Sequence, residues 1–409
     1  MVVVFVLVAV VVLAAFAGLH YYAYRRLVRA STAGPGWPRR LGAAVFVAGP
    51  VLMFAALAAE RAGAPFPLQR ALAWPGFLWM AFALYLLLAL LVGEAVRPLL
   101  RRVLDRRAGG SGPADPEPEP EPEPAPAPEP APVAAPTRRL VLARTVGAAS
   151  AVAAAGIVGN GAYGVLRGPK VKRVTVPLAK LPRAAHGFRI AVVSDVHLGP
   201  VLGRGFAERV VDIVNGTQPD LIAVVGDLVD GSVEDLAPAV APLARLRSRH
   251  GTYFVTGNHE YFSGADPWVA HVREIGMRPL ANARVEMGAF DLAGVNDISG
   301  ENYGEGPDYA KALGDRDTSR AAVLLAHQPV MIHEAVKHGV DLQLSGHTHG
   351  GQLWPGNFVA DAANPTLAGL DTYGDTQLYV SRGAGAWGPP VRVGAPSDIT
   401  VVELASRQA

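Results

Sequence analysis

The stretch Arg189-Ile190-Ala191-Val192-Val193-Ser194-Asp195-Val196-His197 decides the fold of the C-terminal part of the chain. Its apolar run predicts a short buried strand over 189–194, which two polar residues follow at once. Similar runs predict strands over 221–225, 253–256, 322–326 and 342–345. Helix-length segments lie between several of them, over 206–215, 267–275 and 330–338. Repeated strand–helix–strand order predicts an α/β core with helices outside the sheet.

Polar side chains gather where these predicted strands end. They are Asp195, His197, Asp227, Asp230, Asn258, His259, His327, His347 and His349. Each has an ordinary reading by itself, as a helix cap, a turn residue or a surface histidine. Together they include five of the 11 histidines in the chain, which chance placement does not explain. Ligand crevices of α/β folds lie beyond the carboxyl ends of strands, so the pattern predicts one polar site there.

The same residues carry a resemblance to a known family. Asp-x-His, Gly-Asp-x-x-Asp, Gly-Asn-His-Asp/Glu, a lone His and Gly-His-x-His occur in this order between Asp195 and Gly350. This series resembles the calcineurin-like metallophosphoesterase superfamily, and the resemblance covers about 170 to the C-terminus. The run from Ser345 to Gln352 is similar to a branch with membrane-anchored or twin-arginine-exported members, including transmembrane proteins with a metallophosphoesterase domain. The resemblance implies a four-layer α/β sandwich, two mixed sheets flanked by helices, preceded by an all-α transmembrane region.

The resemblance also implies a ligand set for two divalent metal ions. It assigns Asp195, His197, Asp227 and His349 to one ion, and Asp227, Asn258, His327 and His347 to the other. Mixed imidazole and oxygen donors suit Mn, Fe, Zn or Co better than Mg²⁺ or Ca²⁺. One bridging carboxylate, here Asp227, can hold two cations ~3.5–4 Å apart.

The activity that this resemblance implies is hydrolysis of a phosphodiester or phosphomonoester by a metal-activated hydroxide. His259 is expected to stabilise the phosphoryl oxygens or to protonate the leaving group. Asp230 is expected, by family analogy, to orient His259. Glu260 stands where the family more often has Asp, and we expect no catalytic role for it.

The remaining polar and aromatic candidates have ordinary interpretations. His186, His250, His271, His333 and His338 lie off the motifs and are expected at the surface or at caps. Asn296 and Asp297 could approach the cleft, but a turn is the preferred interpretation. Trp354 and Trp387 could shape a substrate wall, but packing is the preferred interpretation.

The N-terminal part has the apolar stretches of a membrane protein. Half of all residues (50%) are hydrophobic, and near-spanning stretches cover 2–24, 41–59 and 72–92. About 20 apolar residues cross a ~30 Å hydrocarbon core. A buried helix bundle of a soluble protein is the rival interpretation, but the segment from Val2 to Val12 has no polar face.

Arginines between these stretches predict an orientation. Arg25, Arg26, Arg29, Arg39 and Arg40 separate the first two stretches, and Arg97, Arg101, Arg102, Arg106 and Arg107 follow the third. The positive-inside rule places both segments in the cytoplasm, so the chain begins outside.

The chain therefore divides into four predicted parts. Residues 1–108 form a three-helix transmembrane region, 109–136 a Pro/Glu-rich linker, 137–168 a fourth membrane helix, and 169–409 the metallophosphoesterase domain. Arg138-Arg139 before the fourth apolar stretch fits a twin-arginine signal or a plain anchor flank equally well. Both interpretations predict a multi-pass protein of the cell membrane with an extracytoplasmic catalytic domain.

Composition and charge narrow the partners and the alternatives. The chain has no cysteine, which excludes thiol catalysis and Cys-based zinc sites. Its net charge is +2, without a basic run interleaved with aromatics, so no nucleic-acid partner is expected. The expected partner is a phosphoester substrate, lipid-linked or from the cell envelope. The alternatives are a catalytically silent metal-binding scaffold or sensor and a cytoplasmic-facing nucleotide phosphodiesterase.

Overall fold

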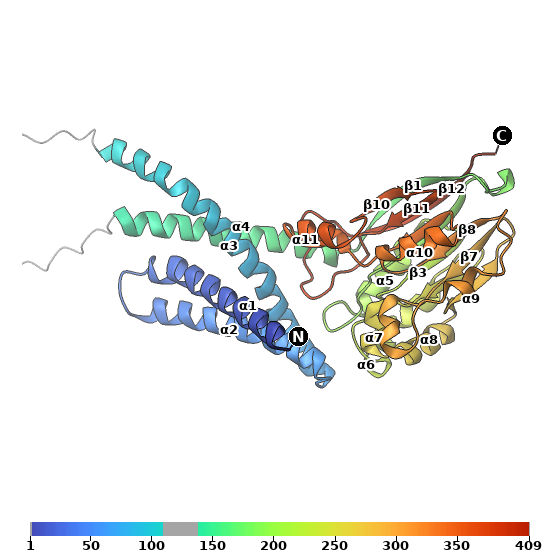
Figure 1. The fold of residues 1–409 in the computed structure, drawn as a ribbon. Helices are drawn as coiled ribbons and strands as arrows, with labels where there is room; N and C mark the ends of the chain where they lie inside the picture. Colours follow the sequence, from blue (N-terminus) through green and yellow to red (C-terminus); the bar gives the residue numbers. More distant parts are fainter. Residues whose placement is uncertain (1, 109–137, 409) are drawn as a thin grey trace, which may run out of the picture. The chain divides into compact units, whose positions relative to one another are not determined.

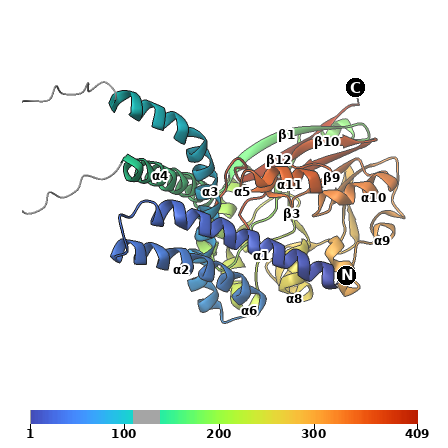
Figure 2. The ribbon, with the colours of Figure 1, turned by 60° about the vertical axis from the view of Figure 1, so that its left-hand side comes forward.

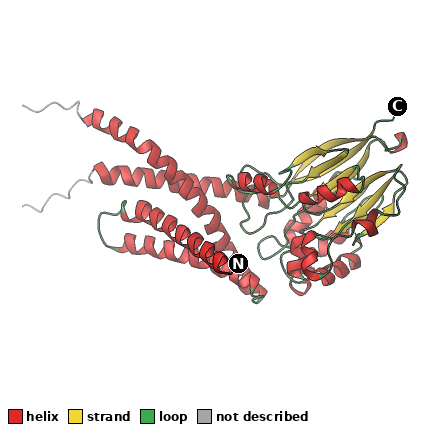
Figure 3. Cartoon of the chain, in the orientation of Figure 1, coloured by secondary structure: helices red, strands yellow, loops and turns green. Residues whose placement is uncertain are grey.

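A computed structural model describes residues 2–108 and 138–408 (Figure 1). The predicted linker over 109–136 lies outside the described residues. The described strands all belong to the C-terminal part of the chain, where β1 begins at Lys170 (Figure 3).

Four long apolar helices precede the strands. They are α1 (Val2–Tyr24), α2 (Trp37–Arg61), α3 (Phe66–Ala108) and α4 (Arg138–Leu166). All four contain a stretch long and apolar enough to cross a membrane, with mean hydropathy between 1.7 and 2.3. The predicted membrane helices are therefore confirmed as candidate spans. The 43 residues of α3 extend well beyond a ~30 Å core, because the arginine-rich segment after the predicted third span continues the same helix.

The chain forms two compact units. One comprises Met1–Val51 and Phe82–Ile157, and the other comprises Leu52–Ala81 and Val158–Ala409. In the first unit, Glu94 on α3 pairs with Arg26 at 3.0 Å and with Arg97 at 3.2 Å. The second unit holds all the motifs and also the junction between α2 and α3.

The second unit contains two mixed sheets of six strands each. The first has the order β1 (Lys170–Leu178), β12 (Asp398–Ser406), β2 (Phe188–Val193), β3 (Leu221–Val225), β4 (Thr252–Val255) and β5 (Arg278–Pro279). The second has the order β10 (Gly369–Tyr373), β11 (Thr376–Val380), β9 (Leu342–Ser345), β8 (Ala321–Leu325), β7 (Phe290–Gly294) and β6 (Ala283–Glu286). Strands β2, β3 and β4 run parallel to one another, and so do β7, β8 and β9.

Alternation along each strand divides the core into layers. Ile190 and Val192 of β2 pack in the core between the two sheets, whereas Ala191 and Val193 face a second core under the helices of the first sheet. This is the period of two that a strand buried on both faces requires. The packing of the two sheets and their covering helices can be followed in Figures 1 and 2.

Helices cover the outer face of each sheet. The first carries α5 (Arg204–Gly216), α6 (Val233–Val240) and α8 (Ala265–Glu274), and the second carries α9 (Tyr309–Leu313) and α10 (Ile332–Lys337). Two further helices are α7 (Asn258–Ser263), which begins with the motif residues Asn258 and His259, and α11 (Gly356–Ala363), which follows the last motif. Two mixed sheets flanked by helices confirm the predicted fold class.

Candidate metal centre

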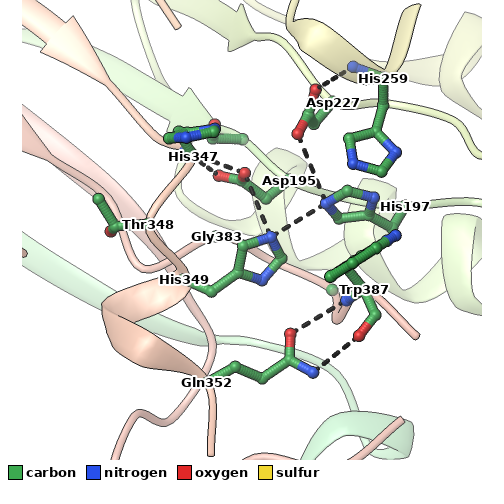
Figure 4. Close-up of polar contacts among 12 residues, drawn as sticks. Asp195, His197, Asp227, His259, His347, Thr348, His349, Gln352, Gly383 and Trp387 are labelled. Carbon is green, nitrogen blue, oxygen red and sulfur yellow. Dashed lines mark hydrogen bonds and ion pairs between the residues drawn. The ribbon is translucent and has the colours of Figure 1, made fainter. Parts of the chain in front are cut away.

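The predicted site residues lie directly after the carboxyl ends of five strands, on loops or in the first turn of the helix that follows. Asp195 and His197 follow β2, Asp227 and Asp230 follow β3, Asn258 and His259 follow β4, His327 follows β8, and His347 and His349 follow β9. Because neighbouring strands of each set are parallel, their ends meet at one edge. Side chains from both sheets converge there (Figure 4).

A first group of possible metal ligands consists of Asp195, His197 and His349, all buried. One ligand atom of each lies within 4.8 Å of the others. The Nε2 atoms of the two histidines are 3.0 Å apart, and His349 Nε2 is 3.4 Å from Asp195 Oδ1. Two imidazole nitrogens and a carboxylate oxygen therefore face one point.

A second group consists of Asp227, His327 and His347, with ligand atoms again within 4.8 Å. His327 Nε2 is 3.2 Å from Asp227 Oδ2, and His347 Nδ1 is 3.0 Å from Asn258 Oδ1. Asp227 Oδ2 also lies 3.8 Å from Nε2 of His197 in the first group. The structure thus brings the seven predicted ligands together and sets Asp227 between the two groups.

Hydrogen bonds leave ring nitrogens available to a metal ion. His327 Nδ1–H donates to the Val225 carbonyl at 2.8 Å, and His197 Nδ1–H donates to Asp230 Oδ1 at 2.9 Å. Both Nε2 lone pairs then face the centre of the site. Among the described residues, the buried His327 Nε2 has no hydrogen-bond partner. A divalent cation would satisfy this nitrogen, so the residues fit metal binding.

The charges of the site suit the same role. Burial lowers the pKa of His347 to about 4, and burial with nearby His197 and Arg392 holds that of His349 well below its ordinary value. Neutral imidazole is the form that ligates metals. Burial opposes ionisation of Asp227, but the charge of His327, whose Nε2 lies 3.2 Å from Asp227 Oδ2, holds the pKa of Asp227 well below normal.

Metal uptake should release a proton from His327. Burial opposes its protonation, but the charge of Asp227 raises its pKa well above the ordinary value, which favours proton binding by the ring in the metal-free chain. A metal ion needs the same Nε2 lone pair, so binding should expel about one proton and weaken as pH falls. Calorimetric Mn²⁺ titrations in two buffers of different ionisation enthalpy measure this proton. The His327→Asn variant should release fewer protons, whereas equal heats in both buffers would contradict the assignment.

A third cluster joins His197, Asp230 and His259. Asp230 Oδ1 lies 2.7 Å from His259 Nδ1 as well as 2.9 Å from His197 Nδ1. Burial disfavours the charged form of His259, but the hydrogen bond and charge of Asp230 outweigh it and raise the pKa of His259 to about 9. Burial likewise opposes ionisation of Asp230, but the two histidines lower its pKa to about 2. At neutral pH the pair is an imidazolium held by a carboxylate, in the arrangement predicted for Asp230.

Five of the seven predicted ligands have left-handed backbone conformations. The φ angles are 51° for Asp195, 48° for His197, 52° for Asp227, 72° for His347 and 53° for His349. Such conformations cost a non-glycine residue of order 1–3 kcal/mol each, and they gather at functional sites. The surrounding loops must hold these residues in place, which indicates a constraint on where their side chains point.

Two glycines allow the ligand loops to approach one another. A side chain at Gly346 would overlap Ser194 Oγ and Asp195 Oδ2, and one at Gly257 would overlap Asp227 Oδ1. The absence of a Cβ at these motif positions therefore lets the loops from different strands meet at the carboxylates.

Glu260 supports the site from beneath. Its buried carboxylate accepts hydrogen bonds from the backbone N–H groups of Asp227 at 2.9 Å, Leu228 at 2.7 Å and Gly257 at 2.6 Å. It thereby ties the loop after β3 to the loop after β4. The sequence analysis noted only that the family more often has Asp at this position. It did not predict this contact, which depends on the carboxylate of Glu260 reaching both loops.

Replacing Glu260 by glutamine should destabilise the protein by about 2 kcal/mol, because an amide NH₂ group would face backbone donors and leave one without an acceptor. Thermal unfolding of the metal-free chain measures the change. The matched control is Glu334→Gln, which removes a surface partner of Lys337 at 2.7 Å and should leave the midpoint nearly unchanged. Equal midpoints for the two variants would contradict the role of Glu260.

Two further supports escaped the sequence analysis. Buried Arg392 donates from Nη2 to His349 Nδ1 at 3.0 Å and from Nη1 to the His349 carbonyl at 2.9 Å. Gln352 Nε2 donates to the Trp387 carbonyl at 2.9 Å, and the Trp387 N–H donates to Gln352 Oε1 at 3.0 Å (Figure 4). No local motif marks Arg392, since its partner is distant in the sequence.

Contrary to the packing expected from the sequence, Trp387 is not buried. It is 47% exposed, and its ring centroid lies 5.7 Å from that of His259. Trp354 is also 48% exposed. The loop contacts of Gln352 hold Trp387 beside the site, which explains why a large aromatic stays at the surface.

The off-motif histidines lie outside the three clusters. His271, for example, pairs with Glu274 at 3.2 Å, and His338 stacks on Tyr309 with centroids 5.4 Å apart. Asp297 forms a turn as expected, since its side chain accepts from the Ser299 N–H at 2.8 Å and caps the short helix Ile298–Tyr303.

Fold and site together define a class of protein, the α/β sandwiches that carry aspartate and histidine metal ligands on the loops at one edge. Residues 188–351 match the family model described as calcineurin-like phosphoesterase. An uncharacterized metallophosphoesterase of Helicobacter pylori is 38% identical over 272 residues, which are 66% of this chain and 73% of that protein. The chain belongs to the metallophosphoesterase family, which confirms the resemblance drawn from the motifs.

Other relatives extend the comparison to membrane proteins. A transmembrane protein with metallophosphoesterase domain from Bos taurus is 41% identical over 253 residues, covering 58% of this chain and 57% of that protein. An uncharacterized metallophosphoesterase of Aquifex aeolicus is 35% identical over 240 residues, covering 58% of this chain and 91% of that protein. With four candidate spans, the chain is thus a membrane-type member of the family.

Proposed function

We propose that this protein hydrolyses phosphodiester or phosphomonoester bonds with two divalent metal ions, of the Mn, Fe, Zn or Co type. The observation that carries the proposal is the position of Asp227, within 3.2 Å of His327 Nε2 and 3.8 Å of His197 Nε2, between the two ligand groups. When bound, the metal ions would supply positive charge for the phosphoryl oxygens and activate a water molecule.

The side chains of the protein supply orientation and a proton. His259 N–H donates to Asp227 Oδ1 at 2.9 Å, which fixes the backbone of His259 beside the ligands. Its imidazolium, held by Asp230, is proposed to stabilise the phosphoryl oxygens or to protonate the leaving alcohol. Asp230 also fixes the ring of His197, so one carboxylate orients a ligand and the proposed acid together.

A direct test uses the full chain in detergent with added Mn²⁺. It should hydrolyse bis-p-nitrophenyl phosphate or p-nitrophenyl phosphate, and a chelator should abolish the reaction. If no divalent metal supports turnover of either ester, the catalytically silent scaffold becomes the better interpretation.

We further propose that the catalytic domain, over 169–409, faces the extracytoplasmic side, after the fourth helix and the linker over 109–136. The arginine-rich segments support this orientation. A second argument for this orientation is that the second unit includes the α2–α3 junction, which the arginine pattern assigns to the outer face. An outward domain at the end of a membrane helix favours a lipid-linked or cell-envelope phosphoester as substrate.

Topology can be measured separately from activity. A reporter fused to the C-terminus should be active in the extracytoplasmic space, and added protease should cleave the catalytic domain in intact cells. A protected, cytoplasmic domain would overturn the orientation and favour a nucleotide phosphodiesterase.

A further inference from the structure

The junction between α2 and α3 belongs to the second unit, with the motifs, and not to the unit that holds the rest of the membrane helices. Ala56 of α2 and Ala73 and Phe77 of α3 form a buried cluster, against which Val201 packs. Val201 belongs to the loop that follows Asp195 and His197. The end of α2 and the beginning of α3, here called the hairpin, therefore contact a ligand loop directly.

A small cavity lies between the hairpin and the site. Glu60 and Phe77 line it from the hairpin, and His197 and Asp230 line it from the metal centre. Ala386 and Gly388, which flank Trp387, line it too. The hairpin thus forms one wall of the cavity next to the cluster of His197, Asp230 and His259.

A second contact places the hairpin near His259. The Arg61 guanidinium lies 6.0 Å from the ring centroid of Phe262, and that ring lies 5.5 Å from the ring of His259. Phe262 is 64% exposed, so Arg61 and this aromatic ring form part of the rim of the site. Trp387 borders His259 at 5.7 Å.

Glu60 is the hairpin group that can meet a ligand. Within the described residues its side chain accepts no hydrogen bond; it lines the same cavity as His197 and Asp230, and its charge interacts with those of Asp230, His259 and the adjacent Arg61. A carboxylate accepts hydrogen bonds and donates none, so it would repel the phosphoryl group and attract a donor or a cation. The proposed proton donor for the leaving alcohol is in the same region.

We propose that Glu60 determines specificity by binding an ammonium group on the alcohol portion of the phosphoester. The proposal deepens the phosphoesterase function and rests on it. The Glu60 carboxylate can accept charge-assisted hydrogen bonds from an ammonium group that enters the cavity that it lines beside Asp230. The positive charge of His259 does not oppose this, because Asp230 balances it at 2.7 Å.

The test measures competitive inhibition of p-nitrophenyl ester hydrolysis by the full chain with Mn²⁺. 2-Aminoethylphosphonate and propylphosphonate have the same length and end in an ammonium and a methyl group. The wild type should bind the amino compound about tenfold more tightly, as expected for one charge-assisted hydrogen bond. Glu60→Gln should bring the ratio of inhibition constants close to one, whereas the exposed control Glu334→Gln should keep the wild-type ratio.

Charge reversal gives a second arm. Glu60→Lys should prefer 3-phosphonopropionate, which ends in a carboxylate, over 2-aminoethylphosphonate. A wild-type ratio near one, or an unchanged preference in Glu60→Gln, would overturn the assignment of Glu60 while leaving the esterase activity established. If the wild type hydrolyses neither chromogenic ester, the proposed function itself fails.

Discussion

Replacing Asp227 by asparagine is expected to lower kcat/KM by at least about 1000-fold. Asp227 lies between the two ligand groups, 3.8 Å from His197 Nε2 and 3.2 Å from His327 Nε2. A neutral amide cannot offset the repulsion between two cations. Losing their stabilisation of the transition state costs several kcal/mol, and ~4 kcal/mol corresponds to about 1000-fold.

Metal analysis separates this effect from misfolding. The Asp227→Asn chain should retain one metal ion or none while its circular dichroism spectrum stays like that of the wild type. Asp361→Asn, on the exposed helix α11, is the control and should retain full metal content and rate. Full metal content and an unchanged rate in Asp227→Asn would refute a bridging role.

Replacing His259 by alanine should lower kcat by about 10²- to 10⁴-fold, the range for loss of a general acid. Metal content should stay near that of the wild type, because His259 is absent from the two ligand groups around Asp227. His271→Ala is the control, since that ring pairs with Glu274 on α8. An unchanged rate in His259→Ala would remove this residue from the mechanism.

The pH profile tests the same role by another route. The pKa of His259 is raised to about 9, so its imidazolium is present at neutral pH and is lost as pH rises through that value. Wild-type activity should therefore have a falling alkaline limb. Bound cations repel the imidazolium and should move this limb to lower pH. A limb that persists in His259→Ala would assign it to another group.

The parts of this account that the sequence could predict share one property, which is that they are local. A run of apolar residues and the polar residues directly after it lie within one strand and one turn. The first membrane helix was expected over 2–24 and is α1, Val2–Tyr24. The ligand residues were assignable through the motifs of the resemblance, and the ends of neighbouring parallel strands must meet, which places Asp195 after β2 beside Asp227 after β3.

Contacts between distant segments were beyond the sequence. Arg392 reaches His349 from 43 residues away, and only the folded loops bring the two together. No role was expected for Glu260, because the N–H groups of Asp227 and Leu228 that donate to its carboxylate belong to another loop. The hairpin was assigned to the membrane part alone, because hydropathy does not indicate which residues at the end of a span contact the domain that carries the motifs.

The length of α3 shows a different limit. Hydropathy marks where apolar residues cross a bilayer, but helix propensity decides where the helix ends, and arginine, leucine and valine continue it to Ala108. The length of a membrane span and the length of its helix are therefore different, and the hydropathy of the N-terminal part predicts only the span.

The most direct test of the metal centre is the number of divalent metal ions bound by the purified full chain, measured together with phosphoester turnover. We expect two equivalents per chain after loading with Mn²⁺, loss of both ions and of activity on chelation, and recovery of both on adding Mn²⁺ back. A chain that binds fewer than one equivalent of every divalent metal tried, or that hydrolyses phosphoesters equally well without metal, would contradict the account.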